Sequence, residues 1–286
     1  MKAKLYNTML VLILGLSSSA IALSPIGPTQ AVVGQNNWGI GINAGYQSMD
    51  LVADGTYFEY QTVEKKTSAK IALEDIESIS SFIELSLGLS PEWDIFGCIG
   101  VSNGEGDATV KNSDPFVQTH AFAQNEKFDI NGDHEMAFGF GTRFTLKDYD
   151  TVKWGGMARI TWQKPKGSST WETIQPLDDH SISGDWELDY WELILAVGPT
   201  FVYDNVQFYG GPFLHMVRGD LNFSGTYSYP GDTGSASTTQ DLEEEALIGG
   251  YLGMQVDLCK TTLFYVDGQF TGKAWGVGAG AILHTR

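Results

Sequence analysis

Between residues 133 and 163, apolar and polar side chains alternate with a period of two, interrupted by Thr142 and by a short polar turn at 148–151. Before the turn one face carries Met136, Phe138, Phe140, Phe144 and Leu146, and after it Val152, Trp154, Gly156, Ala158, Ile160 and Trp162. Side chains of a β-strand point to opposite faces in turn, whereas a helix repeats every 3.6 residues. The stretch therefore predicts two antiparallel strands joined in a hairpin.

The same alternation recurs along the chain and predicts about ten strands, within a range of eight to twelve. Besides the two strands of 133–163, the expected strands span 37–48, 77–90, 92–103, 185–203, 206–222, 242–258, 261–271 and 274–284. The stretch 49–76 could hold extra strand beyond a membrane, and 104–132, 164–184 and 224–240 are expected to be long loops. The side-chain parity changes near Tyr190, which predicts a bulge or a membrane exit there.

Short turns near 91, 149, 204 and 260 alternate with the long connections, and the last connection, near 272, is short. Short turns at one end and long loops at the other are typical of an antiparallel up-and-down transmembrane barrel. The polar strand faces support this, since they consist of glycine and occasional charges rather than the Thr, Lys and Glu of a water-facing sheet. A soluble sandwich remains the alternative.

Two sets of side chains follow from the barrel hypothesis. Inward charges could line a narrow pore or pair with one another and plug the barrel, and a small barrel favours the plug. This set is Glu84, Glu135, Arg143, Lys153, Arg159, Glu192 and Asp267. Aromatic girdles are expected at both membrane interfaces. Their candidates are Trp38, Trp93 and Trp154 near the short turns, and Trp162, Trp186 and Trp275 near the long loops.

The first residues have the organisation of a secretory signal peptide. Lys2 and Lys4 precede an apolar run from Met9 to Leu16, and a small-residue site ends at Ala22. We therefore predict a signal peptide at 1–22, a periplasmic segment at 23–36 and an outer-membrane barrel domain at 37–286. The apolar run is too short for a membrane-spanning helix.

The chain is acidic, with a formal net charge of −18. Loss of Lys2 and Lys4 with the signal peptide would make it two units more negative. Such a surface argues against nucleic acid as a partner, because nucleic-acid binding depends on neutralising phosphates. The acidic residues fall largely in the predicted loops, where divalent ions could bridge them to lipopolysaccharide. Cys98 and Cys259 lie in strands that are not expected to be neighbours, so we expect free thiols.

Several phrases resemble porin-like and OmpA-like outer-membrane β-barrel proteins of Gram-negative cells. They are the hairpins GLSPEWDIFG, GTRFTLKDYDTVKWGG and GPTFVYDNVQFYGG and the closing GVGAGAIL. The resemblance covers about 37–286. It implies an outer-membrane location, the lipid bilayer and lipopolysaccharide as surroundings, and the barrel-insertion machinery as a partner, with no cofactor and no specified substrate or extracellular partner.

Few residues point to chemistry. Asp178, Asp179 and His180, with Asp133, His134 and Glu135, could form an acid–histidine site similar to that of omptin-type outer-membrane proteases. Asp129–Asp133 resembles a calcium loop in composition only. We predict no catalytic, cofactor or metal residue. The expected role is structural or surface-interactive, the alternative is a narrow channel for small solutes, and a loop-borne hydrolase is third.

Overall fold

The computed structural model describes residues 24–60, 64–113, 127–173, 180–229, 232–244 and 247–285 of the 286-residue chain. Regular structure in these ranges is antiparallel β-sheet. No helix within them is long and apolar enough to cross a membrane. The predicted signal peptide at 1–22 lies outside the described residues.

The described strands differ widely in length, and the longest run well beyond the predicted ranges. They are β1 (Trp38–Tyr60), β2 (Glu64–Ser90), β3 (Trp93–Ser102), β4 (Glu105–Ser113), β5 (Lys127–Asn131), β6 (Glu135–Tyr149), β7 (Val152–Gln163), β8 (Lys166–Thr173), β9 (His180–Tyr203), β10 (Val206–Tyr229), β11 (Asp232–Glu244), β12 (Ile248–Cys259), β13 (Thr262–Phe270) and β14 (Ala274–His284).

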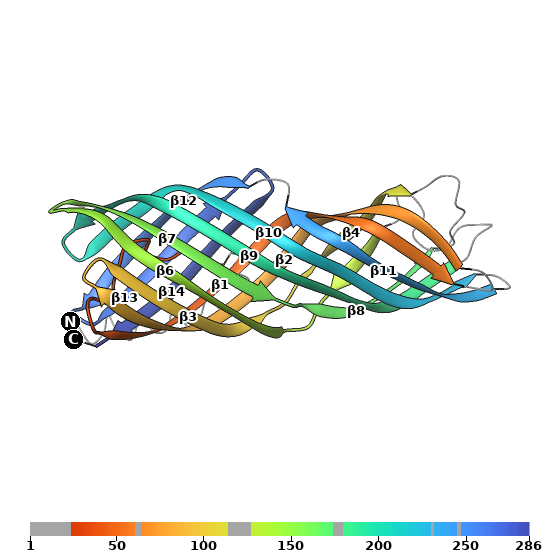
Figure 1. Ribbon diagram of the computed structural model, residues 1–286, viewed down its shortest axis with the longest axis horizontal. Helices are drawn as coiled ribbons and strands as arrows, with labels where there is room; N and C mark the ends of the chain where they lie inside the picture. Colours follow the sequence, from red (N-terminus) through yellow and green to blue (C-terminus); the bar gives the residue numbers. More distant parts are fainter. Residues whose placement is uncertain are drawn as a thin grey trace, which may run out of the picture.

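Ten of the described strands close into a ring. Their order is β1–β14–β13–β12–β10–β9–β7–β6–β3–β2, and β2 pairs with β1 again. The chain is therefore a transmembrane antiparallel β-barrel, as predicted. The hairpin turns after β2, β6, β9 and β12 lie at one end, which we call the turn end (Figure 1). β1 begins and β14 finishes there, where the Thr285 N–H donates to the Trp38 carbonyl at 2.7 Å.

Beyond the opposite end of the ten-stranded ring, the sheet continues into a second cylinder, which we call the extension. It consists of the far halves of β1, β2, β9 and β10 together with β4, β5, β8 and β11 (Figure 1). β11 lies between β1 and β10 and pairs with both. On the other side, β4 and β5 continue from β2, and β8 continues from β9. A bridge between Gly132 and Gly167 links these two groups.

The extension corrects three predicted loops. Residues 104–132 contain β4 and β5, residues 164–184 contain β8 and the start of β9, and residues 224–240 contain the end of β10 and most of β11. The predicted strand 242–258 is divided between β11 and β12. These segments lack a lipid-facing apolar stripe, which is the signal that identified the other strands. The extra strand expected within 49–76 is present as the outer parts of β1 and β2.

The sheet keeps its register while the environments of its two faces are exchanged. In the ten-stranded part, outward side chains such as Ile42, Phe140 and Leu252 are exposed and apolar. In β9, Trp186 and Leu188 share the inward face with Glu192. The β9–β10 register runs unshifted from Ala196 to Ser181. The parity change near Tyr190 therefore marks the predicted membrane exit, because the outer face of the sheet contacts lipid below this level and water above it.

An apolar core fills the extension. Its side chains come from strands all around the cylinder, and they include Leu51, Ala53, Ile71, Leu73, Ala108, Val110, Ile130, Ile182, Trp186, Leu188, Leu221, Phe223, Ala236 and Leu242. Burial of such side chains stabilises the extension by the hydrophobic effect, as in a soluble protein. The interior is thus apolar in the extension and polar in the membrane-spanning barrel.

Candidate functional site

The segment that precedes β1 lies inside the barrel. Residues 24–30 are all buried, although no strand of the sheet pairs with them. The sequence predicts a periplasmic segment at 23–36, but residues 24–33 of it fill the lumen at the membrane-spanning level. We call residues 24–33 the plug. Its backbone N–H and C=O groups need partners in a lumen from which water is largely excluded.

Two aspartates satisfy N–H groups of the plug. Asp267 of β13 accepts from Ile26 at 3.3 Å and from Gly27 at 2.8 Å. Asp94 of β3 accepts from Val32 at 2.6 Å and from Val33 at 3.0 Å. Hydrogen bonds to a carboxylate are stronger than those between neutral groups. The aspartates therefore hold the two halves of the plug against opposite regions of the wall.

The innermost residue of the plug, Ser24, is held by charged side chains of β7 and β9. Arg159 donates to the Pro25 carbonyl and the Ser24 carbonyl, both at 2.7 Å. The Ser24 hydroxyl donates to Glu192 at 3.1 Å. Arginine suits this position because its planar group presents several N–H donors in a fixed geometry.

Close packing at the turn end fixes where the segment leaves the lumen. The Asn36 N–H donates to the Gly88 carbonyl at 2.8 Å, and the Gly88 N–H donates to Asn37 at 3.0 Å. A Cβ at Gly88 would overlap the carbonyl oxygen of Gly34, which itself adopts a positive φ of 80°. At Gly88 only glycine leaves room for this approach, and at Gly34 the positive φ favours glycine.

A buried ion pair spans β3 on the inner wall of the barrel. Arg143 of β6 donates to both carboxylate oxygens of Glu84 on β2, at 2.8 and 2.7 Å. The Ser86 hydroxyl also donates to Glu84 at 2.7 Å, and the Arg143 guanidinium lies 4.2 Å from the centre of the Phe96 ring. The pair thus has the additional hydrogen bonding that a buried charge requires.

A histidine joins the barrel to the extension. His215 Nε2 lies 2.8 Å from Glu192 Oε1, and His215 Nδ1 lies 2.6 Å from Glu244 Oε2. All three side chains are at most 1% exposed. An imidazole donates from both ring nitrogens only when it is protonated. This cluster closes the lumen between the plug and the apolar core above it.

The structure places five members of the predicted inward set inside the barrel, namely Glu84, Arg143, Arg159, Glu192 and Asp267. The other two do not belong to this network. Glu135 is partly exposed at the base of the extension and pairs with Lys166 at 3.0 Å. Lys153 lies near the turn after β6, where it is 3.3 Å from the exposed Asp148. Both residues share the strand parity of the inward side chains, but parity could not indicate their depth.

The predicted aromatic girdle needs one correction. Trp38, Trp93, Trp154 and Trp275 are 45–52% exposed on the outer surface. Trp162 is half-buried, and its Nε1 donates to Asp189 at 2.8 Å. Trp186 is only 2% exposed and belongs to the extension core. The same residue type marks a lipid interface in one environment and an apolar interior in the other.

The residues proposed for hydrolysis are described only in part. Asp178 and Asp179 lie outside the described residues, and His180 begins β9 with its side chain undescribed. Asp133 and His134 are exposed and directly precede β6. Within the described ranges, no group of three His, Cys, Asp or Glu side chains is placed to hold a metal ion. Cys98 and Cys259 are free, as predicted.

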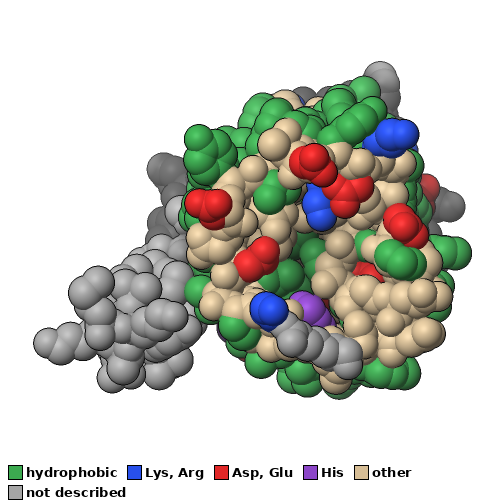
Figure 2. Space-filling model, turned by 90° about the vertical axis from the view of Figure 1, so that its left-hand side faces the viewer, with side chains coloured by type: hydrophobic (Ala, Val, Ile, Leu, Met, Phe, Trp, Pro, Cys, Tyr) green, Lys and Arg blue, Asp and Glu red, His purple; other side chains and the backbone are tan. Residues whose placement is uncertain are grey.

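A cavity of about 520 Å³ opens at the turn end, below the plug. Figure 2 shows this end face-on, with hydrophobic side chains around the circumference and charged side chains of both signs within it. Gln30 and Val32 of the plug contribute to the cavity lining, opposite Gln255 and Asp257 of β12. The plug therefore separates the cavity from the rest of the lumen.

Sequence reasoning missed the plug altogether. The signal that could have indicated it is the composition of 24–37, which contains no Asp, Glu, Lys or Arg in an otherwise acidic chain. An uncharged segment with Ile26, Val32 and Val33 is better suited to an interior than to open solvent. Its hydrogen-bond partners in the barrel wall, such as Asp94 and Asp267, are more than 50 residues away in sequence, so no local pattern identifies them.

Comparisons with known proteins show a similarity of fold to solved outer-membrane proteins. No family model and no curated protein matches the chain. Among solved structures, the outer membrane protease OmpT from Escherichia coli is 9% identical, with 89% of this chain and 96% of that chain covered and a TM-score of 0.43. The Ralstonia pickettii toluene transporter TbuX is 10% identical, with 93% and 98% covered and a TM-score of 0.37.

The transport unit of the autotransporter AIDA-I from Escherichia coli is 13% identical, with 98% and 97% covered and a TM-score of 0.32. These proteins have different activities according to their names. At such identities and TM-scores, none of those activities transfers to this chain.

Proposed function

We propose that this protein is a closed outer-membrane β-barrel that anchors a surface-exposed extension, with a structural or surface-interaction role. The observation that supports closure is the plug, held by Arg159, Asp94 and Asp267 in the lumen of the membrane-spanning part. Above the plug, the His215 cluster and the apolar core of the extension also fill the interior. A pore would require both to move.

The proposed location rests on the signal-peptide pattern of 1–22 and on the apolar outer belt of a closed barrel, which suits a bilayer. In the orientation we propose, the turn end faces the periplasm and the extension faces the exterior. Short periplasmic turns and longer external structure are the usual arrangement in outer-membrane barrels.

An acidic row on the extension supports a role in surface interactions. Asp54, Asp241, Asp220 and Asp189 stand directly opposite one another on β1, β11, β10 and β9. The first three are exposed. Like charges directly opposite in a sheet destabilise it. An aspartate row that lowers the stability of the sheet is consistent with selection for binding. A basic partner surface would match the negative charge of the row, as would divalent ions that bridge it to lipopolysaccharide.

Planar-bilayer recording of the refolded protein tests closure, with insertion confirmed by a heat-dependent gel shift. We expect inserted wild-type protein to be silent. We also expect Arg159→Ala, which frees the innermost end of the plug, to stay silent because the extension core remains. Steady conductance steps from wild-type protein would contradict the proposal and favour the narrow-channel alternative.

Binding of an oligolysine peptide to the protein in detergent tests the surface role. We expect binding that weakens with salt and that Asp241→Asn reduces, since Asp241 has an aspartate on each side. Asp185→Asn is the matched control, because Asp185 is exposed on the same cylinder but stands opposite Ser224 and Ser168. Equal loss of binding in both variants would show that the attraction is nonspecific.

The hydrolase alternative predicts a cleavage activity that His180→Ala or Asp179→Asn abolishes.

A further inference from the structure

The barrel wall holds the plug mainly by its backbone, in pairs of successive groups. Asp267 and Asp94 each accept from two successive N–H groups, and Arg159 donates to two successive carbonyls. Thr145 also accepts from the Ala31 N–H at 3.2 Å. Backbone groups are the same in every residue except proline, so these contacts bind a chain without reading most of its sequence. Main-chain hydrogen bonds provide the affinity in other peptide-binding sites.

The composition of the plug shows which chains fit this wall. Residues 24–33 contain no charged side chain, and Pro25 and Pro28 have no N–H group that would need a partner in the lumen. Gly27 adopts a positive φ of 67°, and a Cβ there would lie 3.2 Å from Cζ of the Tyr265 ring. A larger residue is therefore disfavoured at this position. The wall suits an uncharged peptide that has glycine at one defined position.

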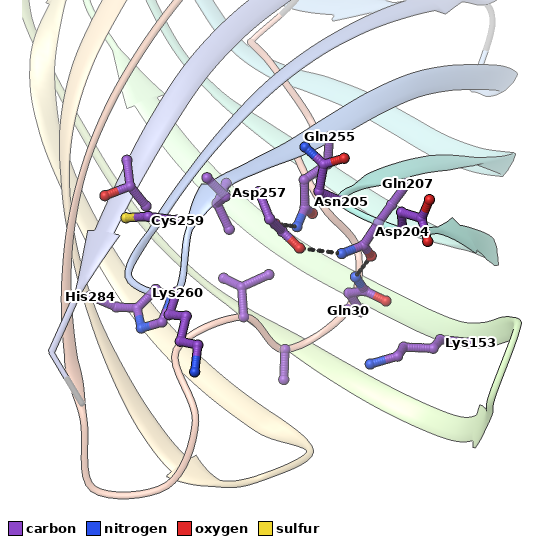
Figure 3. A pocket seen from close by; sticks show the side chains of 14 residues that line it. Gln30, Lys153, Asp204, Asn205, Gln207, Gln255, Asp257, Cys259, Lys260 and His284 are labelled. Carbon is purple, nitrogen blue, oxygen red and sulfur yellow. Dashed lines mark hydrogen bonds between the residues drawn. The ribbon is translucent and has the colours of Figure 1, made fainter. Parts of the chain in front are cut away.

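The outer half of the plug borders open space. Gln30, Ala31 and Val32 line the turn-end cavity of about 520 Å³. Figure 3 shows Gln30 at the edge of this cavity, where its amide donates to Gln207 and Gln207 donates to Asp257. A peptide that enters from the turn end therefore reaches the outer half of the binding surface before the inner half has to be vacated.

We propose that the inner wall of the barrel is a peptide-binding site and that the plug is its tethered occupant. The ligand is an uncharged segment of another chain that contains glycine and proline and enters from the turn end. A tethered segment competes at an effective concentration on the order of millimolar, so the plug keeps the site occupied until a tighter-binding peptide arrives. Exchange at the wall leaves the His215 cluster and the extension core in place. Peptide binding is thus independent of the proposed surface role.

A double variant of the full-length protein, Gly27→Val with Val33→Asp, separates the wall from its own plug. The first change strains the backbone and crowds Tyr265, and the second places a carboxylate beside Asp94, while no wall residue is altered. The probe is the synthetic peptide SPIGPTQAVVGQ, residues 24–35, acetylated at its N-terminus and carrying a fluorescent dye at its C-terminus.

Fluorescence anisotropy in detergent measures binding of this peptide, after a heat-dependent gel shift has confirmed that the protein is folded. We expect saturable binding to the double variant. Binding to wild-type protein should be at least about tenfold weaker, because its plug competes for the site.

Matched changes test whether the peptide takes the place of the plug. The same peptide with Gly27→Val should bind the double variant about tenfold more weakly, because a β-branched residue disfavours a positive φ. Addition of Asp267→Asn to the double variant should weaken binding of the unchanged peptide by about the same factor, since Asp267 accepts two of its N–H groups. Asp148→Asn, an exposed change at the turn end, should leave binding unaltered.

Three outcomes would overturn the proposal. They are equal binding to wild-type protein and the double variant, no binding to the folded double variant at millimolar peptide, and equal binding of the two peptides, which would show nonspecific adsorption. If the double variant gives no gel shift, Val33→Asp alone carries the same expectations, because it disturbs only the outer half of the plug.

Discussion

Arg143 and Glu84 form a bidentate ion pair on the inner wall of the barrel, although β3 lies between their strands β6 and β2. Their side chains are 2% and 4% exposed. The pair ties together three strands at the level of the plug. It also illustrates how this barrel accommodates buried charges: inward charged side chains bond to other wall residues or to the plug rather than to water.

Removal of one member of this pair should be strongly destabilising. We expect Arg143→Ala to lower the free energy of unfolding by about 3–5 kcal/mol, because Glu84 is left buried and unpaired. The double variant Arg143→Met with Glu84→Leu should lose less than Arg143→Ala. Urea unfolding in detergent measures both. Lys153→Ala is the control and should change stability by about 1 kcal/mol or less, since its partner is exposed.

The plug should be protected from reagents in the native barrel. In a Cys98→Ala, Cys259→Ala background, Ser24→Cys is expected to react slowly with a water-soluble thiol reagent, because residue 24 is 1% exposed. Addition of Arg159→Ala removes the donors to the Ser24 and Pro25 carbonyls and should speed the reaction. Mass spectrometry of the labelled protein gives the rate. Rapid labelling without Arg159→Ala would contradict a seated plug.

Trp38 and Trp186 should differ in how strongly brominated lipids quench their fluorescence. Brominated lipids are expected to quench Trp38, which is 52% exposed on the outer surface, but not Trp186, which is 2% exposed in the extension core. Trp186→Ala should cost about 3–5 kcal/mol in the free energy of unfolding, as for other buried aromatics. Quenching of Trp186 by brominated lipids would contradict its burial in the extension core and would place it in the aromatic girdle. Single-tryptophan variants make the two signals separable.

Neutralisation of Asp241 should stabilise the extension. Because Asp54 and Asp220 flank it in register, Asp241→Asn is expected to raise the free energy of unfolding by about 0.2–1 kcal/mol at low salt, and by less at high salt. Asp185→Asn, which relieves no such contact, should leave stability unchanged. Denaturant titrations at two salt concentrations compare them, and an effect independent of salt would argue against repulsion.

Cys259 should behave as a reactive thiol near neutral pH. Hydrogen bonds from the Thr261 and Thr262 side chains lower the pKa of its thiol to about 7. The thiolate is the nucleophile, so the rate of alkylation by iodoacetamide in a Cys98→Ser background should rise with pH and reach half its maximum at about pH 7. Thr261→Val should move that midpoint upward. A midpoint that stays unchanged in this variant would exclude the Thr261 contribution.

The fold was largely predictable because period-two alternation is a local signal. The hairpin at 133–163, the strands around Ile83 and Val277, and the membrane exit near Tyr190 could all be read from side-chain parity. Strands β4, β5 and β8 and most of β11 were missed because they lack the lipid-facing apolar stripe, so their sequences resemble ordinary loops. Parity also identified Glu84, Arg143 and Asp267 as inward residues, but it could not indicate their partners.

The sequence by itself therefore determined an antiparallel barrel with apolar residues outside and selected charges inside, since each strand's pattern reflects the media on its two faces. Only the tertiary structure decided that residues 24–33 fill the lumen, that Trp186 belongs to a core rather than a girdle, and that four aspartates align across four strands. These features depend on contacts between residues far apart in the chain. Such contacts are set by barrel closure and strand register, and the local periodicity of the sequence contains no information about either.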